Sequence, residues 1–182
     1  SQNYQKQIQE IESHGVRMYR KSQEDNSPTI GVISVESVLD KPELLEEVFG
    51  PFSMVVYSPS TSLISELILI LPGQLTATVL GSKKEIKKNI TLIGNLQKKV
   101  GRILFEGVPT GVAVCASMNH GGPFPASTDT RFTSVGTDAI YRWLRPVAYQ
   151  DCPDNLLPDA LKNKNPLGLQ RNVNGKITGS EI

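Results

Sequence analysis

The stretch from Glu46 to Pro51, Glu-Glu-Val-Phe-Gly-Pro, combines two carboxylates, an aromatic ring and a rigid turn. Gly50 lets the backbone turn without a side-chain clash and Pro51 fixes the next φ angle, so the loop can hold its side chains still. An ionised carboxylate only accepts hydrogen bonds and suits the paired hydroxyls of a ribose, whereas an aromatic ring can cover a flat heterocycle. These residue types therefore suggest a nucleotide cofactor near Glu47 and Phe49.

This stretch and a later run of residues resemble a known protein family. The run from Glu46 to Phe52, EEVFGPF, resembles the E-x-F-G-P motif of the aldehyde dehydrogenase superfamily. An expected strand–helix–strand unit follows it and leads to Gly-Arg-Ile-Leu-Phe at 101–105. The resemblance extends from about Ile8 to about Leu169 and concerns only the C-terminal part of the family's pattern.

Three later segments resemble one branch of that superfamily, the enzymes that oxidise 2-oxoglutarate semialdehyde (2,5-dioxopentanoate). They are Pro109–Val112 (PTGV), His120–Ser127 (HGGPFPAS) and Arg145–Gln150 (RPVAYQ). The family's cofactor-binding N-terminal domain, its glutamate general base and its cysteine nucleophile lie upstream of the matching part. The resemblance therefore implies a fragment of an aldehyde dehydrogenase, which oxidises an aldehyde to a carboxylate with NAD or NADP.

The reaction in this family passes through a thiohemiacetal on the cysteine, hydride transfer to the nicotinamide and hydrolysis of a thioester. Because this chain lacks that cysteine, we expect it to be inactive by itself. Two other interpretations stay open: a stand-alone, non-catalytic α/β binding or assembly module, and a related reductase of acyl phosphates or acyl thioesters. The His120–Ser127 run is not expected in such a reductase. The choice between NAD and NADP is made in the missing domain.

The resemblance assigns cofactor contacts to two residues. Glu47 stands where the family's glutamate holds the nicotinamide ribose, and Phe49 matches the aromatic residue beside the nicotinamide. The alternatives are a solvated carboxylate for Glu47 and core packing for Phe49. Glu46 is given no role.

The segment from 119 to 131 is expected to face the substrate. In the branch it resembles, the double-glycine loop borders the substrate tunnel, so His120, Phe124 and Ser127 are candidate wall residues. Arg131 is a candidate for the distal carboxylate of a dicarboxylic semialdehyde, because a guanidinium fork matches a carboxylate. The alternatives are plain turn residues for the glycines and a pairing of Arg131 with Asp129 or Asp138.

Neither cysteine is expected to be a nucleophile. Val114 and Ala116 flank Cys115, and such an apolar setting would raise the thiol pKa and leave it inert. Cys152 is expected to be a surface or interface thiol. With only two histidines besides, His14 and His120, we expect no metal site.

The composition limits the classes of protein to which this chain could belong. A chain of 182 residues with 38% hydrophobic and 20% charged residues is typical of one globular domain. A net charge of +1 and the lack of a long apolar run argue against nucleic-acid and membrane partners. Two separated cysteines and no signal-peptide pattern indicate a cytoplasmic location.

Hydrophobic periodicity predicts an α/β fold. It indicates a first helix from Tyr4 to Ile11, ended by Gly15, and a short helical turn from Asp40 to Glu46. A second helix carries the apolar stripe Leu63, Ile64, Leu67, Ile68 and Leu71. A third runs from a capping box at Ser82 and Glu85 to Val100, where Gly101 closes it. The four basic residues Lys83, Lys84, Lys87 and Lys88 are read as a solvated face of it.

Strands are predicted between these helices. The expected strands are 16–19, 29–35, 53–57, 76–80 and 103–105. Alternation of strand and helix from 53 to 105 implies parallel pairing, hence a parallel sheet covered by helices. The glycine- and proline-rich stretch 107–136 is expected to be loop, followed by a short helix at 137–144.

The C-terminal part is predicted to serve assembly. We divide the chain into a part of the catalytic domain at 1–141 and an oligomerisation strand and tail at 142–182. Residues 145–150 match the family's strand that joins the oligomerisation sheet, so a homo-oligomer is expected through them. The last residues, 175–182, are expected to be flexible.

Overall fold

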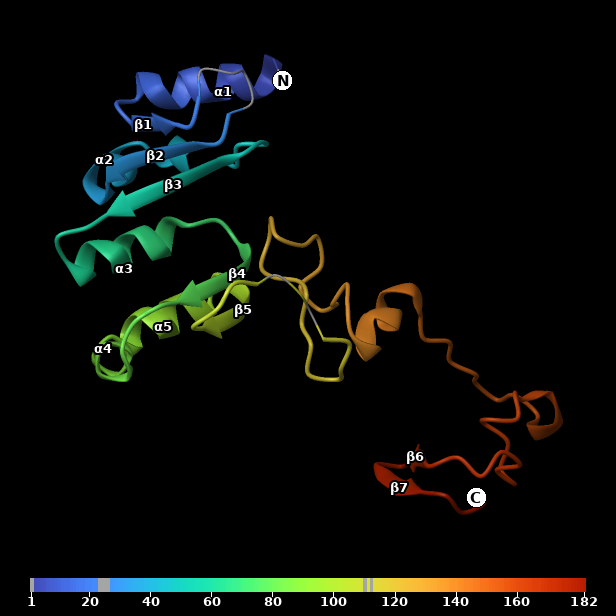
Figure 1. Cartoon of the computed structure of the whole chain (residues 1–182). Helices are drawn as coiled ribbons and strands as arrows, with labels where there is room; N and C mark the ends of the chain where they lie inside the picture. The colour runs from blue at the N-terminus through green and yellow to red at the C-terminus, as the bar shows by residue number, and fades with distance from the viewer. Residues whose placement is uncertain (1, 23–26, 110, 112) are drawn as a thin grey trace. The chain divides into compact units, whose positions relative to one another are not determined.

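The chain forms two compact units in the computed structural model, Ser1–Arg142 and Trp143–Ile182 (Figure 1). The structure describes residues 2–22, 27–109, 111 and 113–182. Within the motif at 109–112, Thr110 and Val112 lie outside the described residues, as do residues 23–26. The assignment of the two segments to catalysis and assembly stays a prediction.

The first unit begins with a helix on a three-stranded sheet. Helix α1 (Gln2–Ser13) buries Tyr4, Ile8 and Ile11 as its spacing predicts. Strands β1 (Arg17–Arg20), β2 (Thr29–Ser34) and β3 (Phe52–Tyr57) follow in the order β1-β2-β3. The β1–β2 pair is antiparallel and the β2–β3 pair is parallel.

A helix that the sequence reading missed follows β2 directly. Helix α2 (Val35–Asp40) is capped by the Ser34 side chain, which accepts a hydrogen bond from Ser37 N. A 3₁₀ helix, η1 (Pro42–Leu45), follows where the helical turn was expected. Val35 was expected to end the strand, but it begins this helix and is fully buried with Val38. The core cluster comprises Ile11, Val16, Ile33, Val38 and Leu44.

Two strand–helix repeats complete the regular part of this unit. The elements are α3 (Thr61–Ile70), β4 (Gln74–Val79), α4 (Lys83–Lys88), α5 (Ile90–Gln97) and β5 (Val100–Phe105). Ser60 caps α3, and the capping box of Ser82 and Glu85 begins α4 as predicted. All four lysines of α4 are exposed, as expected of a solvated face.

Three local predictions about these helices were wrong. The single helix expected after Ser82 is divided at Asn89, whose side-chain amide donates to Glu85 O at 2.9 Å and competes with the helical backbone. Gly101 does not close a helix but lies inside β5. The predicted buried stripe of α3 is buried only at Ile68.

The prediction of one parallel sheet is confirmed only in part. Strands β4 and β5 pair in parallel, as do β2 and β3. The described strands nevertheless form separate sheets, β1-β2-β3 and β4-β5, and β3 has no ladder with β4. Helix α3 connects β3 to β4 and lies between the two sheets (Figure 1). The chain is thus mixed α/β rather than a continuous parallel sheet.

The described residues between β5 and the 3₁₀ helix η2 (Thr137–Trp143) form loop, as predicted. The second unit contains η3 (Asp154–Leu156) and the hairpin of β6 (Arg171–Val173) and β7 (Lys176–Thr178). The hairpin corrects the expectation of a flexible end at 175–182. Its turn residues, Asn174 and Gly175, have φ angles of 50° and 85°, which an Asn-Gly pair adopts readily.

Residues 145–150 do not form the strand that their alternation predicts. A strand exists only where its backbone groups meet those of a neighbour, and no described strand pairs with this segment. Its role in oligomerisation stays a proposal.

Candidate functional site

Helix α1 contacts the Glu46–Pro51 loop and fixes its position. The ring of Tyr4 lies where a Cβ on Gly50 would stand, so only glycine permits this close approach. The Tyr4 hydroxyl donates to Pro51 O and the Gln7 side-chain amide donates to Glu47 O, each at 3.5 Å. Helix α1 and the turn thus set the position of Glu47 without using its carboxylate.

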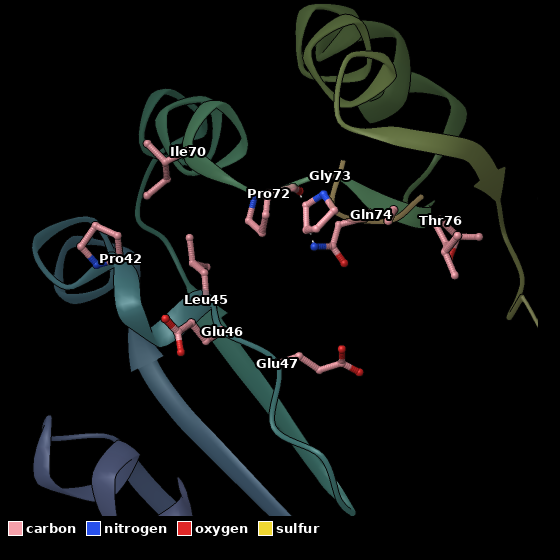
Figure 2. Close-up of a pocket in the computed structure, with 12 residues that line it drawn as sticks. Pro42, Leu45, Glu46, Glu47, Ile70, Pro72, Gly73, Gln74 and Thr76 are labelled. Carbon is pink, nitrogen blue, oxygen red and sulfur yellow. Dashed lines mark hydrogen bonds between the residues drawn. The ribbon is translucent and has the colours of Figure 1, made fainter. Parts of the chain in front are cut away.

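The Glu47 side chain is exposed and lies on the wall of a cavity of about 850 Å³. Figure 2 shows its carboxylate directed toward the side of Gln74 and Thr76, whereas the Glu46 carboxylate points another way, on the side of Pro42. The two glutamates are therefore not equivalent. Both glutamates line the cavity, and the rest of its wall consists of Pro42, Leu45, Ile70, Pro72, Gly73, Gln74, Leu75, Thr76, Pro125 and Ala126.

Phe49 does not line this cavity, and its side chain is 73% exposed. Core packing, the alternative for this residue, is therefore wrong. An exposed aromatic ring on a fixed loop can stack on a flat ligand. Its contact with a nicotinamide stays a prediction.

Glycines bring the loop at 120–127 to the amino ends of β4 and β5. A Cβ on Gly101 would overlap the carbonyl oxygen of Gly121, and a Cβ on Gly73 would overlap that of Pro123. Gly122 has the same constraint, since its Cβ would lie 2.5 Å from Gln74 O. Backbone therefore packs directly on backbone.

Hydrogen bonds hold this contact. Gly73 N donates to Phe124 O at 3.2 Å, and the Asn119 side-chain amide donates to Gly101 O at 3.0 Å. As a result Pro125 and Ala126 reach the same cavity wall as Glu47. Two segments that are far apart in the sequence, the carboxylate loop and the double-glycine loop, thus meet at one cavity.

His120 and Ser127 line a second cavity, of about 500 Å³. The His120 backbone is fixed: its N–H donates to Thr133 Oγ1 at 2.8 Å, and its carbonyl accepts from Ser134 N at 2.9 Å. The Ser127 hydroxyl donates to Gly122 O at 2.6 Å and so braces the loop. Of these two residues, only His120 is left with its side chain for contact with a ligand.

Phe124 and Arg131 are not brought into either cavity. The Phe124 side chain is 77% exposed. Arg131 forms a fork with Asp129, with Nη2 2.6 Å from Oδ2 and Nε 3.0 Å from Oδ1, and its guanidinium lies 5.4 Å from the Phe132 ring centre. These bonds to Arg131 lower the pKa of Asp129 to about 2. The alternative pairing that the sequence allowed is thus formed.

Arg142 is a residue that the sequence reading did not single out. It lines the His120 cavity from η2 and brings a permanent positive charge to that wall. Asp129 lines the same cavity and offers the opposite charge. No local motif indicates Arg142, because the loop 121–136 and the first part of η2 separate it from His120.

The reason given for an inert Cys115 was wrong. Val114 and Ala116 are exposed rather than part of an apolar interior, and the Ser117 hydroxyl lies 3.4 Å from the Cys115 sulfur. This hydrogen bond lowers the pKa of the Cys115 thiol, whereas the sequence reading expected a raised value. Cys115 and Cys152 are both half-buried free thiols.

The described part of the chain was expected to lack a metal site and a membrane-spanning helix. No three side chains of the metal-binding types lie close enough together there to hold an ion. None of the helices described has the length and apolar character required to cross a membrane.

The sequence is similar to two curated enzymes. It is 49% identical over 137 residues to alpha-ketoglutaric semialdehyde dehydrogenase of Acinetobacter baylyi, which is 75% of this chain and 26% of that protein. It is 44% identical over 144 residues to alpha-ketoglutaric semialdehyde dehydrogenase 2 of Azospirillum brasilense, which is 79% of this chain and 27% of that protein. The chain thus spans about a quarter of the length of these relatives. No protein-family model matches the sequence.

Solved structures show a related fold. Betaine aldehyde dehydrogenase of Staphylococcus aureus matches with a TM-score of 0.54 and 16% identity, over 78% of this chain and 28% of that one. Delta-pyrroline-5-carboxylate dehydrogenase of Mycobacterium tuberculosis matches with a TM-score of 0.54 and 20% identity, over 87% and 31%. The resemblance to aldehyde dehydrogenases is confirmed as a partial match: the chain shares part of their fold and part of the sequence of alpha-ketoglutaric semialdehyde dehydrogenases.

Proposed function

We propose that this chain is one part of an NAD(P)-dependent aldehyde dehydrogenase that oxidises alpha-ketoglutaric semialdehyde to the dicarboxylate. The observation that carries this proposal is the 49% identity over 137 residues to an enzyme of that name. The geometry supports it, because the two motifs of the resemblance, at Glu47 and at 120–127, meet at one cavity.

The residues present fit one edge of a nicotinamide nucleotide. Glu47 offers an exposed carboxylate on a loop fixed through Tyr4 and Gln7, and its free oxygens suit the hydroxyls of a ribose. Phe49 offers an exposed ring two positions along. When bound, the cofactor would accept a hydride from the substrate. A solved structure of the Mycobacterium tuberculosis relative contains NAD.

The loop at 120–127 forms the substrate side of the proposal. His120 and Ser127 would form the wall, whereas the exposed Phe124 lines neither described cavity and could contact the substrate only from outside them. The substrate carries a distal carboxylate that needs a cation. Arg131 was the first candidate, but it lines neither cavity, whereas Arg142 lines that of His120 and Ser127. Arg142 is therefore the better candidate.

By itself the chain should not turn over substrate. Its nucleophile and general base would come from the remainder of the enzyme, which in the matched relatives accounts for about three quarters of the length. We further propose that the parent enzyme is cytoplasmic, in keeping with two free thiols, and is a homo-oligomer that uses residues 145–150.

A hybrid enzyme tests the proposal. In it, this chain replaces the matching 137-residue segment of the Acinetobacter baylyi dehydrogenase. We expect the hybrid to oxidise alpha-ketoglutaric semialdehyde with NAD or NADP, and the chain alone to show no rate. A folded hybrid that binds neither cofactor would contradict the proposal, as would a cysteine-dependent rate from the chain alone.

A further inference from the structure

The turn of the C-terminal hairpin contains a pair of residues that can react without an enzyme. Asn174-Gly175 is the one Asn-Gly pair in the sequence, and asparagine is a chemically labile residue. Once the Gly175 backbone nitrogen has lost its proton, it can attack the Asn174 side-chain amide carbon. The new N–Cγ bond closes a five-membered succinimide ring and ammonia leaves; water then opens the ring to aspartate or isoaspartate. Glycine favours this attack because it has no side chain in the way.

The folded turn keeps these two groups out of the geometry that the reaction needs. Val173 pairs with Lys176, so β6 and β7 are joined by a two-residue loop. The φ angles of Asn174 and Gly175 are 50° and 85°, as a type I′ turn requires. Ring closure needs rotation about Asn174 until its Cγ lies over the Gly175 nitrogen. The paired strands on both sides oppose that rotation, so the folded loop disfavours the reaction.

A neighbouring side chain also holds the attacking nitrogen. Gly175 N donates to Asn172 Oδ1 at 2.9 Å. Because the nitrogen must lose that proton before it attacks, breaking this hydrogen bond adds to the cost of the reaction. The Asn172 side chain is exposed, so its packing adds little to the hairpin. Its bond to Gly175 is therefore the contribution that bears on the turn.

The hairpin is short enough to open locally. Each of its strands has three residues, and both turn residues are exposed. Two-stranded hairpins are only marginally stable by themselves. The end of this hairpin away from the turn is held by side chains: Arg171 Nη1 donates to Lys162 O at 2.6 Å, and Asn165 Nδ2 donates to Gly179 O at 2.7 Å. Opening should therefore begin at the turn, where the reacting pair lies.

We propose that Asn174 is a deamidation site that the folded hairpin keeps unreacted, with Asn172 as its guard. The reaction proceeds when the turn opens and Gly175 N is released from Asn172 Oδ1. Water is the only other reactant, and ammonia is the leaving group. This inference is independent of the proposed function, since it rests on contacts within the second unit.

Ageing of the whole chain, folded and in urea, tests the proposal. Samples kept at mildly alkaline pH are followed by peptide mapping with mass spectrometry, which separates the asparagine, aspartate and isoaspartate forms. We expect Asn174 to deamidate at least about tenfold faster in urea than in the folded chain. Asn155, which is exposed and followed by Leu156, should react far more slowly in both and is the internal control. Equal rates at Asn174 in the two states, or no reaction there in urea, would overturn the proposal.

Two variants of Asn172 test the guard in the folded chain. Asn172→Ala removes the acceptor and should speed deamidation of Asn174 about 3- to 10-fold, which is the effect of one hydrogen bond. Asn172→Asp keeps an acceptor for Gly175 N, so its rate should not exceed that of the original chain. An unchanged rate in Asn172→Ala, or equal acceleration in both variants, would overturn the role of Asn172.

Ile177→Ala is the matched control for a general weakening of the hairpin. Ile177 pairs with Asn172 across the ladder, has no part in the bond to Gly175, and is 71% exposed. We expect this substitution to leave the rate at Asn174 unchanged. If it accelerated deamidation as much as Asn172→Ala, loss of the hairpin rather than of the guard would be the cause, and the guard would be overturned.

The two products should differ in their effect on the hairpin. Aspartate tolerates the left-handed conformation and keeps an ordinary backbone, so β6 and β7 can pair again. Isoaspartate carries the chain through the former side chain and adds a carbon atom to the backbone, so the two-residue loop no longer fits the register. Hydrogen exchange over residues 171–178 of the separated products should be faster in the isoaspartate form. Equal exchange in the two forms would contradict this consequence of the proposal.

Discussion

At the residue scale, Glu47 differs from Glu46 by position alone. Both carboxylates are exposed, but only that of Glu47 is directed toward β4 (Figure 2). In the hybrid enzyme, Glu47→Gln should lower kcat/KM for the cofactor about 10- to 100-fold, because it weakens hydrogen bonds to a charged acceptor. Steady-state kinetics with varied NAD or NADP measure this.

Glu46→Gln is the matched control for that prediction, since it makes the same chemical change one residue away. It should change kcat/KM by less than about twofold. Equal losses in both variants would show that the loop, and not the Glu47 carboxylate, is what the cofactor needs.

The pKa of the Asp129 carboxyl gives a prediction about its titration with pH. Its bonds to Arg131 lower its pKa to about 2, so the fork is intact above the ordinary carboxyl range and is lost as the pH falls toward 2. An NMR titration of the Asp129 carboxyl should have its midpoint near 2. In Arg131→Gln the midpoint should return to about 3.9. A midpoint unchanged by that substitution would mean that Arg131 is not the partner in solution.

The positions of the candidate residues could be predicted from the sequence only in part. Glu47 could be singled out as a candidate because its motif is local and its loop is short. Arg142 could not, because its approach to His120 depends on how an irregular stretch folds, and that leaves no periodic signal. The Cys115 error had a similar cause: neighbours in the sequence were taken for the thiol's surroundings, whereas the Ser117 hydroxyl decides its pKa.

At the scale of elements, the 120–127 loop contacts the sheet through the glycines at the strand ends. Gly101→Ala would place a methyl group on the carbonyl oxygen of Gly121, so the loop must move. We expect a loss of about 1–3 kcal/mol in the free energy of unfolding. Urea denaturation followed by circular dichroism measures it.

Gly94→Ala is the control for that substitution. Gly94 lies in α5, and a Cβ there would meet nothing within 4 Å. The substitution should stabilise the chain by about 0.5–1 kcal/mol, since alanine favours a helix over glycine. A loss of stability in both variants would indicate that neither reports on the loop contact.

The capping box gives a second prediction at this scale. The Ser82 hydroxyl accepts from Glu85 N, and its bonds to the Glu85 side chain lower the pKa of that carboxyl. Ser82→Ala should cost about 1 kcal/mol, whereas Ser82→Thr, which keeps both the acceptor for Glu85 N and the donor to Glu85 Oε2, should cost little. A lowered folded-state pKa means that the Glu85 contribution is present at neutral pH and is lost as the pH falls through that pKa. Thermal unfolding at neutral and acidic pH checks both points.

Caps and turns were the elements most open to prediction, because their signals are local. Ser82 and Glu85 begin a helix where the sequence predicts. The Asn174-Gly175 hairpin carried an equally local signal and could have been recognised. Pairing between strands could not be predicted in the same way, since the crossover from β3 to β4 fixes a direction but not a neighbour.

At the scale of the whole molecule, the described buried hydrophobic residues all lie between Tyr4 and Val100. The hydrophobic core thus belongs to the first unit, and the second unit has the short hairpin β6–β7 as its sheet. This distribution separates the part that holds the core from the part proposed for assembly. Stability should depend on the first unit, and any role of residues 145–150 in assembly should leave that core unchanged.

Deletion of residues 145–182 tests this separation, because it keeps η2 and every buried hydrophobic residue described. The thermal midpoint of the shortened chain, followed by circular dichroism, should lie within about 2–4 °C of the whole chain. The same deletion in the hybrid enzyme should lower its oligomeric state in sedimentation, because the segment proposed to pair between subunits is gone. An unchanged oligomer would contradict the assembly role, and a collapse of the thermal midpoint would show that the first unit depends on the second.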